Sequence, residues 1–263
     1  VGGLLVGITT AKAISFAHRL PFIAVNHLEG HALTVRLTGD NSGKNVSFPY
    51  LLLLISGGHC QILIVDGVNN YKRLGSTIDD ALGEAFDKSS KMMGLGYPGG
   101  PKVEQYAKLG LKTRFPLPRP LKGRPGCNFS FSGLKTKVRQ TIESLPPGPL
   151  NTRDIQDLCA SFQDAVGEVL IDRCTHAIEE FLSKHSNGGH FVVAGGVAAN
   201  INLRQRLMKL AENYNLPFAC PPINLCTDNA AMIAWAGVEL LKNNKTNNLD
   251  FCARPKWPLE PSS

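Results

Sequence analysis

The sequence predicts an α/β protein whose ligands bind where strands end. Two apolar runs each pass directly into a glycine turn, at residues 50–59 (YLLLLISGGH) and 190–200 (HFVVAGGVAAN). A shorter run at residues 22–27 (FIAVNH) passes into a helix. Strands that lead into glycine turns and then helices are typical of α/β sheets, so we expect the site to be assembled from several loops at strand carboxyl ends.

The first part of the chain predicts two helices with a strand between them. Helical periodicity over residues 4–19 stops at Pro21. Residues 22–25 predict a short strand, residues 27–37 a second helix, and residues 39–48 a polar loop.

An antiparallel meander follows. Residues 50–55 are continuously apolar, residues 60–65 (CQILIV) form a second strand, and the Asp66-Gly67 pair indicates a hairpin turn into a third strand near Tyr71. Residues 79–93 are amphipathic and predict a helix that ends at a glycine.

The second half is mainly helical. A short helix begins at the PGG of residues 98–100, and a loop rich in proline, arginine and lysine follows as far as Asn128. Residues 151–184 predict a long helix. The buried strand HFVVA comes next, and further helices start after Asn200 and Thr227.

Composition fits a globular enzyme. The chain has 263 residues, is 43% hydrophobic and contains no apolar run near the ~20 residues that span a bilayer. Its start lacks the order of a secretory signal. The seven cysteines are never two residues apart in pairs, which favours free thiols in a reducing compartment. The formal charge of +7 permits a polyanionic partner without requiring one.

The segment NHLEGHAL carries the sharpest local signal. His27 and His31 are four apart on a predicted helix, so they share a face and can hold one metal ion. A helical histidine pair without a metal is the ordinary alternative. Glu29 lies midway between them, whereas zinc proteases place the general base directly beside a histidine, so the motif does not support protease chemistry.

A third ligand would have to come from far along the chain. Asp228, in LCTDNAAMIAW, stands at a helix start, where capping is its default role and ligation is compatible with capping. A His, His, Asp set leaves positions for a substrate oxygen and suits iron or zinc equally well.

Glycine loops and carboxylates suggest a nucleotide site. SGGH, PGG and AGGVAAN would let backbone amides approach a phosphate or ribose, although each alone is more often only a turn. Asp87 and Glu104 lie on predicted helices. A carboxylate is what a ribose hydroxyl pair requires, and an ordinary ion pair with Lys88 or Lys91 is the alternative for Asp87.

A basic block covers residues 105–142. It has nine basic residues and no acidic one, with phenylalanines among the cations that could stack on unpaired bases. This pattern favours RNA over a merely solvated loop. The cations expected to contact tRNA are Lys112, Arg114, Arg119, Lys122, Arg124, Lys135, Lys137 and Arg139.

Taken together, the motifs resemble those of the TsaD-type tRNA threonylcarbamoyltransferase family. The segments that carry the resemblance stand in the family's order: NHLEGHAL, SGGH, STIDDALGEAFDKSSKMMGLGYPGGP, NFSFSGLKT, AGGVAAN and CTDNAAMIAW. They cover nearly the whole chain and look like those of the alphaproteobacterial or mitochondrial branch.

The resemblance implies the two-lobed fold of actin, the sugar kinases and the heat-shock chaperones. Residues 1–26 would be a remnant of the first lobe, residues 27–226 the second lobe, and residues 227–263 a helix and tail returning to the first. The family's first lobe begins with a segment bearing an ETSCDD motif that this chain lacks. We therefore expect an incomplete first lobe, and poor solubility or activity for these residues alone.

The activity that the resemblance implies is transfer of a threonylcarbamoyl group from threonylcarbamoyl-AMP to the exocyclic amine of the adenosine next to the anticodon. The tRNAs concerned read codons that begin with A, and AMP is released. Iron is the metal implied, with zinc as the alternative. A paralogous partner subunit with an ATPase, or a homodimer, and the bacterial cytoplasm or the mitochondrial matrix are also implied.

Site residues carry over motif by motif. His27, His31 and Asp228 would be metal ligands and the catalytic centre. The substrate loop would be Ile55, Ser56, Gly57, Gly58 and His59. Asp87, Gly100 and Asn200 would hold the adenylate, with Glu104 as their neighbour. Leu54 stands where the archaeal branch has a metal-binding tyrosine, so no such ligand is expected.

Two other function classes remain open at this point. A metallopeptidase would need a base that activates water, and peptide cleavage blocked by a chelator would reveal it. A paralogue that binds partners without turnover would retain no affinity for the adenylate.

Overall fold

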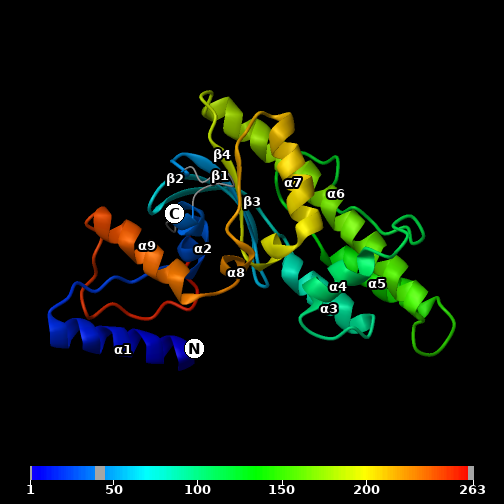
Figure 1. Ribbon diagram of the computed structural model, residues 1–263, viewed down its shortest axis with the longest axis horizontal. Helices are drawn as coiled ribbons and strands as arrows, with labels where there is room; N and C mark the ends of the chain where they lie inside the picture. Colours follow the sequence, from blue (N-terminus) through cyan, green and yellow to red (C-terminus); the bar gives the residue numbers. More distant parts are fainter. Residues whose placement is uncertain (1, 39–44, 260–263) are drawn as a thin grey trace.

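A five-stranded mixed sheet forms the centre of the computed structural model, which describes residues 2–38 and 45–259 (Figure 1). The strand order is β3-β2-β1-β4-β5. Strands β1 (Tyr50–Ile55), β2 (Cys60–Gly67) and β3 (Asn70–Ser76) form the antiparallel meander. Strand β4 (His190–Ala194) runs parallel to β1, and β5 (Phe218–Ala219) runs parallel to β4. The predicted α/β class is confirmed.

The sheet is buried on both faces, which explains why β1 is continuously apolar. Successive side chains of a strand point to opposite faces. Leu51 and Leu53 belong to a large cluster on the side of α6 (Thr152–Lys184), whereas Leu52 and Leu54 belong to a smaller cluster with α2 (His27–Thr38). All four leucines are fully buried. The sheet therefore holds two helical layers in fixed positions.

Helix α9 (Ala230–Lys242) packs against α2 on the smaller-cluster side (Figure 1). Gly30 of α2 permits this approach, because a Cβ atom there would lie 3.0 Å from Ile233 Cδ1. The short helix α8 (Ile223–Cys226) and residues 227–229 lead into α9. The start of α9 is thereby brought to the start of α2.

The other layer contains α3 to α7. Helix α6 crosses the sheet and contacts α4 (Gly99–Ala107), α5 (Ser132–Glu143) and α7 (Ile201–Asn213). Helix α3 (Leu82–Met92) packs on α4 and α5. A 3-10 turn, η1 (Gly196–Ala199), joins β4 to α7. In Figure 1, α3, α4 and α5 lie together at one end of the molecule.

Helix α1 (Gly2–His18) stands apart from the sheet (Figure 1). Only Ser15 of this helix is buried. The strand expected over residues 22–25 does not form: Phe22 makes an isolated bridge with Asn247, and Ala24 N–H donates to the Asn247 side chain. In the described chain this segment lies beside a loop that offers a single bridge, so no ladder of hydrogen bonds develops.

Two smaller differences concern a turn and a helix. The hairpin turn after β2 lies at Val68 and Asn69, two residues beyond the predicted Asp66-Gly67 pair, and Asn69 takes the left-handed conformation with φ of 61°. Helix α5 was not anticipated from the sequence. Residues 39–44, which are part of the predicted polar loop, lie outside the described residues.

Among the helices described, none has the length and apolarity to cross a membrane. The seven cysteines are free thiols.

Candidate metal centre and nucleotide loops

Three residues from distant parts of the chain meet where α2 and α9 begin. His27 is the first residue of α2, and His31 lies one turn later on the same face. Asp228 directly precedes Asn229, whose side chain caps α9 by accepting from Met232 N–H. The ligand atoms of His27, His31 and Asp228 all lie within 4.8 Å of one another. The cap is therefore supplied by Asn229, which leaves Asp228 available to the cluster.

The spacing of these atoms fits one metal ion. Asp228 Oδ1 lies 3.0 Å from His31 Nε2 and 3.4 Å from His27 Nε2. Two ligands at about 2.1 Å from one ion are separated by about 3.0 Å at a right angle and about 3.4 Å at a tetrahedral angle. Two imidazoles and one carboxylate form a donor set common in transition-metal sites.

The cluster is closed on one side and open on the other. The His31 side chain is 2% exposed, whereas those of His27 and Asp228 are 51% and 76% exposed. Burial, together with the charge of His27, lowers the pKa of His31, so its imidazole is neutral at pH 7 and keeps a lone pair for ligation. Burial also lowers the pKa of nearby His59. The open side gives a substrate access to the cluster.

Glu29 faces away from the histidines. Its buried carboxylate accepts a 2.8 Å hydrogen bond from Tyr71 Oη–H and a 3.0 Å bond from Asn69 N–H. These two donors belong to the β2–β3 hairpin, so Glu29 fastens α2 to the sheet. The carboxylate of α2 is thus unavailable as the water-activating base that a metallopeptidase would require.

The SGGH loop presents unused backbone amides. Ser56 N–H donates to His59 O at 2.8 Å and closes the turn. Gly57 and Gly58 are exposed, and within the described chain their amides donate no hydrogen bond. Gly83, at the start of α3, donates to Ser56 O at 3.2 Å. Two free amides at the end of β1 can bind a phosphate or carbonyl oxygen.

Two of the predicted adenylate residues, Asp87 and Gly100, lie where α3 meets the PGG loop. Asp87 of α3 accepts from Gly99 N–H at 2.7 Å through Oδ1, which fixes the PGG loop. Gly100 is half-buried and has open space where a side chain would extend. Asp87 Oδ2 makes no hydrogen bond within the described chain and can accept from a ribose hydroxyl.

The side chains of Glu104, from α4, and of Asn200, the residue before α7, both cap the start of α7. Glu104 Oε1 accepts from Ile201 N–H at 2.8 Å and Asn202 N–H at 3.2 Å. Asn200 Oδ1 accepts from Leu203 N–H at 3.0 Å. The first three amides of the helix are therefore satisfied by the protein, and the anion site that the sequence suggested at this helix start is filled by Glu104.

Gln163 is a site residue that sequence reasoning missed. Its Oε1 atom accepts a 2.9 Å hydrogen bond from Asn200 Nδ2, and both side chains are buried. With its amide engaged at both ends, Asn200 is held in one orientation. The only signal in the sequence is a polar residue inside the long apolar helix α6, and such residues are common on helices.

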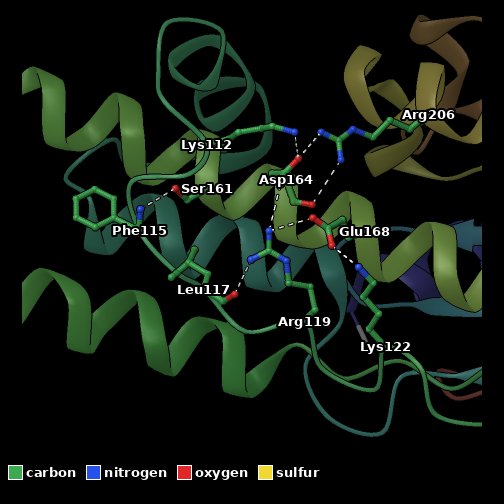
Figure 2. Close-up of polar contacts among 9 residues, drawn as sticks. All are labelled: Lys112, Phe115, Leu117, Arg119, Lys122, Ser161, Asp164, Glu168 and Arg206. Carbon is green, nitrogen blue, oxygen red and sulfur yellow. Dashed lines mark hydrogen bonds and ion pairs between the residues drawn. The ribbon is translucent and has the colours of Figure 1, made fainter.

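Four of the nine cations of the basic block are paired with carboxylates of α6, and Figure 2 shows three of them, Lys112, Arg119 and Lys122. Asp164 accepts from Lys112 and Arg119 at 3.1 Å and from Arg206 at 2.8 Å. Glu168 pairs with Arg119 and Lys122. Arg114 pairs with Asp154 and Asp157. We call residues 111–124 the strap, because these ion pairs fasten it along α6.

The predicted tRNA-contacting residues thus fall into two groups. Lys112, Arg114, Arg119 and Lys122 belong to the strap, as does Arg124, which makes no ion pair in the described chain. Lys135, Lys137 and Arg139 lie on α5. The prediction that these residues bind tRNA stays a prediction, and the pairing reduces the positive field that the strap presents to solvent.

Comparison with known proteins identifies a family whose sequence model matches most of this chain. The sequence model of a family described as tRNA N6-adenosine threonylcarbamoyltransferase matches residues 1–235. A Rhodospirillum rubrum protein with that name is 60% identical over 263 residues, which are 100% of this chain and 71% of the relative. Proteins with the same name from Paramagnetospirillum magneticum and Brucella suis are 57% and 55% identical, again over 100% of this chain and over 74% and 72% of their own lengths.

Proposed function

The chain belongs to the tRNA N6-adenosine threonylcarbamoyltransferase family, and from this premise we propose how its residues carry out that transfer. The enzyme attaches a threonylcarbamoyl group to the N6 amino group of a tRNA adenosine. We infer that the donor is threonylcarbamoyl-AMP and that the acceptor is the adenosine beside the anticodon in tRNAs reading codons that begin with A. The observation that carries the proposal is the meeting of His27, His31 and Asp228 where α2 and α9 begin.

Transfer requires the adenosine N6 to attack the carbamoyl carbon of the donor. The carbon–nitrogen bond forms as the bond between that carbon and the phosphate oxygen breaks, AMP leaves with the electron pair, and N6 gives up one proton. The chemistry that a bound divalent ion supplies is polarisation of a carbonyl oxygen. His27, His31 and Asp228 would hold that ion, and we propose iron ahead of zinc.

The loops around the cluster would bind the adenylate. The free amides of Gly57 and Gly58 would donate to oxygen atoms of the donor, and the Asp87 carboxylate would accept from a ribose hydroxyl. Gly100 would leave room for the nucleotide, while Asn200 and Glu104 would hold the start of α7 in position. His59, half-buried and held neutral, would complete the wall near the cluster.

Partners and compartment are also proposals. The exposed apolar residues of α1, among them Leu5, Val6 and Phe16, support a contact with a paralogous subunit or a second copy. An associated ATPase would act with that assembly. We propose the bacterial cytoplasm as the compartment, with the mitochondrial matrix as the alternative.

The first test is nucleoside mass spectrometry of tRNA from cells depleted of this gene. Loss of threonylcarbamoyladenosine supports the proposed transfer, and its persistence without a redundant enzyme contradicts it. Rescue with His31→Ala should fail, whereas Lys245→Ala, a change at an exposed lysine on the loop after α9, should rescue fully. Purified His31→Ala should also lose bound metal while still binding tRNA. Peptide cleavage that a chelator blocks would favour the peptidase alternative instead.

A further inference from the structure

A groove between α3 and α5 is walled by the aliphatic stems of four cationic side chains together with a methionine and a threonine. Its volume is about 280 Å³, and its walls are Lys88, Lys91, Met92, Lys135, Thr136 and Arg139. The α3 residues stand at i, i+3 and i+4, and Lys135 and Arg139 stand at i and i+4, so each helix turns one face to the groove. Four positive groups line it without a carboxylate among them.

The groove is held open by a fixed arrangement of its walls. Asp79, in the turn before α3, accepts hydrogen bonds from Phe131 N–H at 2.8 Å and from the hydroxyls of Ser130 and Ser132 at the start of α5. Asp80 lies between Lys88 and Lys135, at 3.4 and 2.6 Å. The neighbouring carboxylates therefore fix the two helices and two of the lysines before any ligand arrives.

The other two cations are available to a ligand. Lys91 is exposed and makes no ion pair within residues 2–38 and 45–259. Arg139 lies 3.7 Å from Glu143, and both side chains are more than 60% exposed, so this pair contributes little and is readily exchanged. The strap differs, because four of its cations pair with α6 carboxylates that include the nearly buried Asp157 and Asp164.

The position of the groove suits a long polyanion that also reaches the candidate site. Gly83 begins α3 against the SGGH loop, where a Cβ atom would lie 2.7 Å from Ser56 O. Lys91 is eight residues further along α3, which corresponds to about 12 Å at 1.5 Å per residue. The backbone of a folded RNA, with a phosphate at every nucleotide, can reach the groove and the SGGH loop together.

We propose that the α3–α5 groove binds the sugar–phosphate backbone of the RNA substrate, away from the adenosine that is modified. This inference rests on the proposed function, because it assumes that tRNA is the acceptor. Lys91 and Arg139 contact phosphates directly, while Lys88 and Lys135, which are paired with Asp80 and Glu84, form the fixed walls of the groove. Contacts of this kind position the RNA without reading its sequence.

The test measures how tRNA binding by the full chain depends on salt. Unmodified tRNA is titrated at salt concentrations from 50 to 200 mM against the wild type, the groove variant K91A/R139A, and the control K209A/K245A. The control removes the same charge from exposed lysines on α7 and on the loop after α9. Losing two phosphate contacts should flatten the slope of log K against log salt by about 1.4 to 1.8. The KM for tRNA should rise, with the KM for the adenylate unchanged.

Two outcomes overturn the proposal. One is a groove variant whose salt slope equals that of the control. The other is a strap variant, K112A/K122A, that flattens the slope while the groove variant does not, which would assign the RNA surface to the strap. The two failures are distinguishable because they appear in different measurements. If the proposed function is wrong, the wild-type enzyme forms no modified nucleoside, yet its tRNA binding still gives a measurable slope of log K against log salt.

Discussion

Glu104 illustrates how one carboxylate can take a role that its motif does not reveal. The sequence suggested a neighbour of the adenylate, and the structure shows the carboxylate accepting two amides at the start of α7. A negative charge at a helix start is favoured by both hydrogen bonding and the helix dipole. Glu104 thereby joins the PGG helix α4 to the AGGVAAN turn.

Glu104→Ala should lower the free energy of unfolding by about 1 kcal/mol, because two amides in the first turn of α7 lose their acceptor. Glu104→Gln should lose less, since the amide oxygen can still accept. Urea unfolding measures the stability of both variants. The control is Glu212→Ala, at an exposed glutamate near the end of α7. Equal stability of Glu104→Ala and the control would mean that the cap is absent in solution.

Local spacing predicted the residues of the metal cluster better than those around the nucleotide loops. His27 and His31 share a helix, so their common face follows from the sequence alone. Gln163 and Asn200 are joined only through the packing of α6 against α7, and no local pattern indicates such a pair. The pairing of the strap was hidden for the same reason, because the acids that balance it lie on α6, outside the acid-free block.

At the scale of elements, α3 depends on glycine for its approach to the SGGH loop. A Cβ atom on Gly83 would lie 2.7 Å from Gly57 Cα and from Ser56 O, closer than packed atoms allow. Gly83→Ala should therefore displace the loop and cost about 1 to 3 kcal/mol. Adenylate affinity should fall as well, as measured by calorimetry with a non-hydrolysable analogue.

Gly133→Ala is the matched control for that prediction. Gly133 also lies in the first turn of a helix, α5, but no atom lies within 4 Å of a Cβ placed there. This change should leave binding unaltered and stabilise the helix by about 0.5 to 1 kcal/mol. A destabilised Gly83→Ala protein with normal adenylate affinity would argue against the SGGH loop as part of the adenylate site.

The strap should respond to acid through Asp164. Burial alone would raise the pKa of Asp164, but hydrogen bonds from Arg206 and Lys112 outweigh it and hold the pKa below the ordinary 3.8. A carboxylate whose folded pKa is depressed stabilises the fold above its unfolded pKa, and that stabilisation is lost as pH falls through the folded value. The contribution is thus complete at pH 7 and declines below about pH 4.

Asp164→Asn isolates this effect. At pH 7 the variant should be less stable than the wild type by about 3 kcal/mol, because Arg206 and two other cations lose a nearly buried partner. Denaturant unfolding at a series of pH values should show the difference narrowing below pH 4. Hydrogen exchange of residues 111–124 should rise in the variant at neutral pH. A pH-independent difference would mean that the Asp164 carboxylate is not held ionised by the strap.

Which elements form was largely predictable, whereas how they meet was not. The meander, the long helix α6 and the helix of the histidine pair follow from hydrophobic period and length. The predicted strand over residues 22–25 was wrong, because four consecutive apolar residues give the same pattern in a strand and in a buried loop. Their conformation depends on the segment beside them, and here that segment offers one bridge, between Phe22 and Asn247. The metal cluster likewise depends on the packing of α9 on α2, which Gly30 permits.

At the scale of the whole molecule, the metal ligands join segments about two hundred positions apart. His27 and His31 begin α2 and Asp228 leads into α9, on the side of the sheet opposite α6. An ion bound only by the folded state stabilises that state by mass action, by about 2.7 kcal/mol at a concentration one hundred times its dissociation constant. In a chain of this size that corresponds to a rise in Tm of about 5 to 10 °C.

Thermal unfolding with and without divalent metal tests this linkage. Apo protein prepared with a chelator should unfold at a lower temperature, and iron(II) or zinc should each restore the Tm to an extent that reports its relative affinity. Asp228→Ala should abolish the response, because two imidazoles on one helix no longer hold α9 through the ion. The exposed Asp250→Ala should retain it. If Asp228→Ala responded to metal as strongly as Asp250→Ala, the ion would bind elsewhere and the assigned cluster would be wrong.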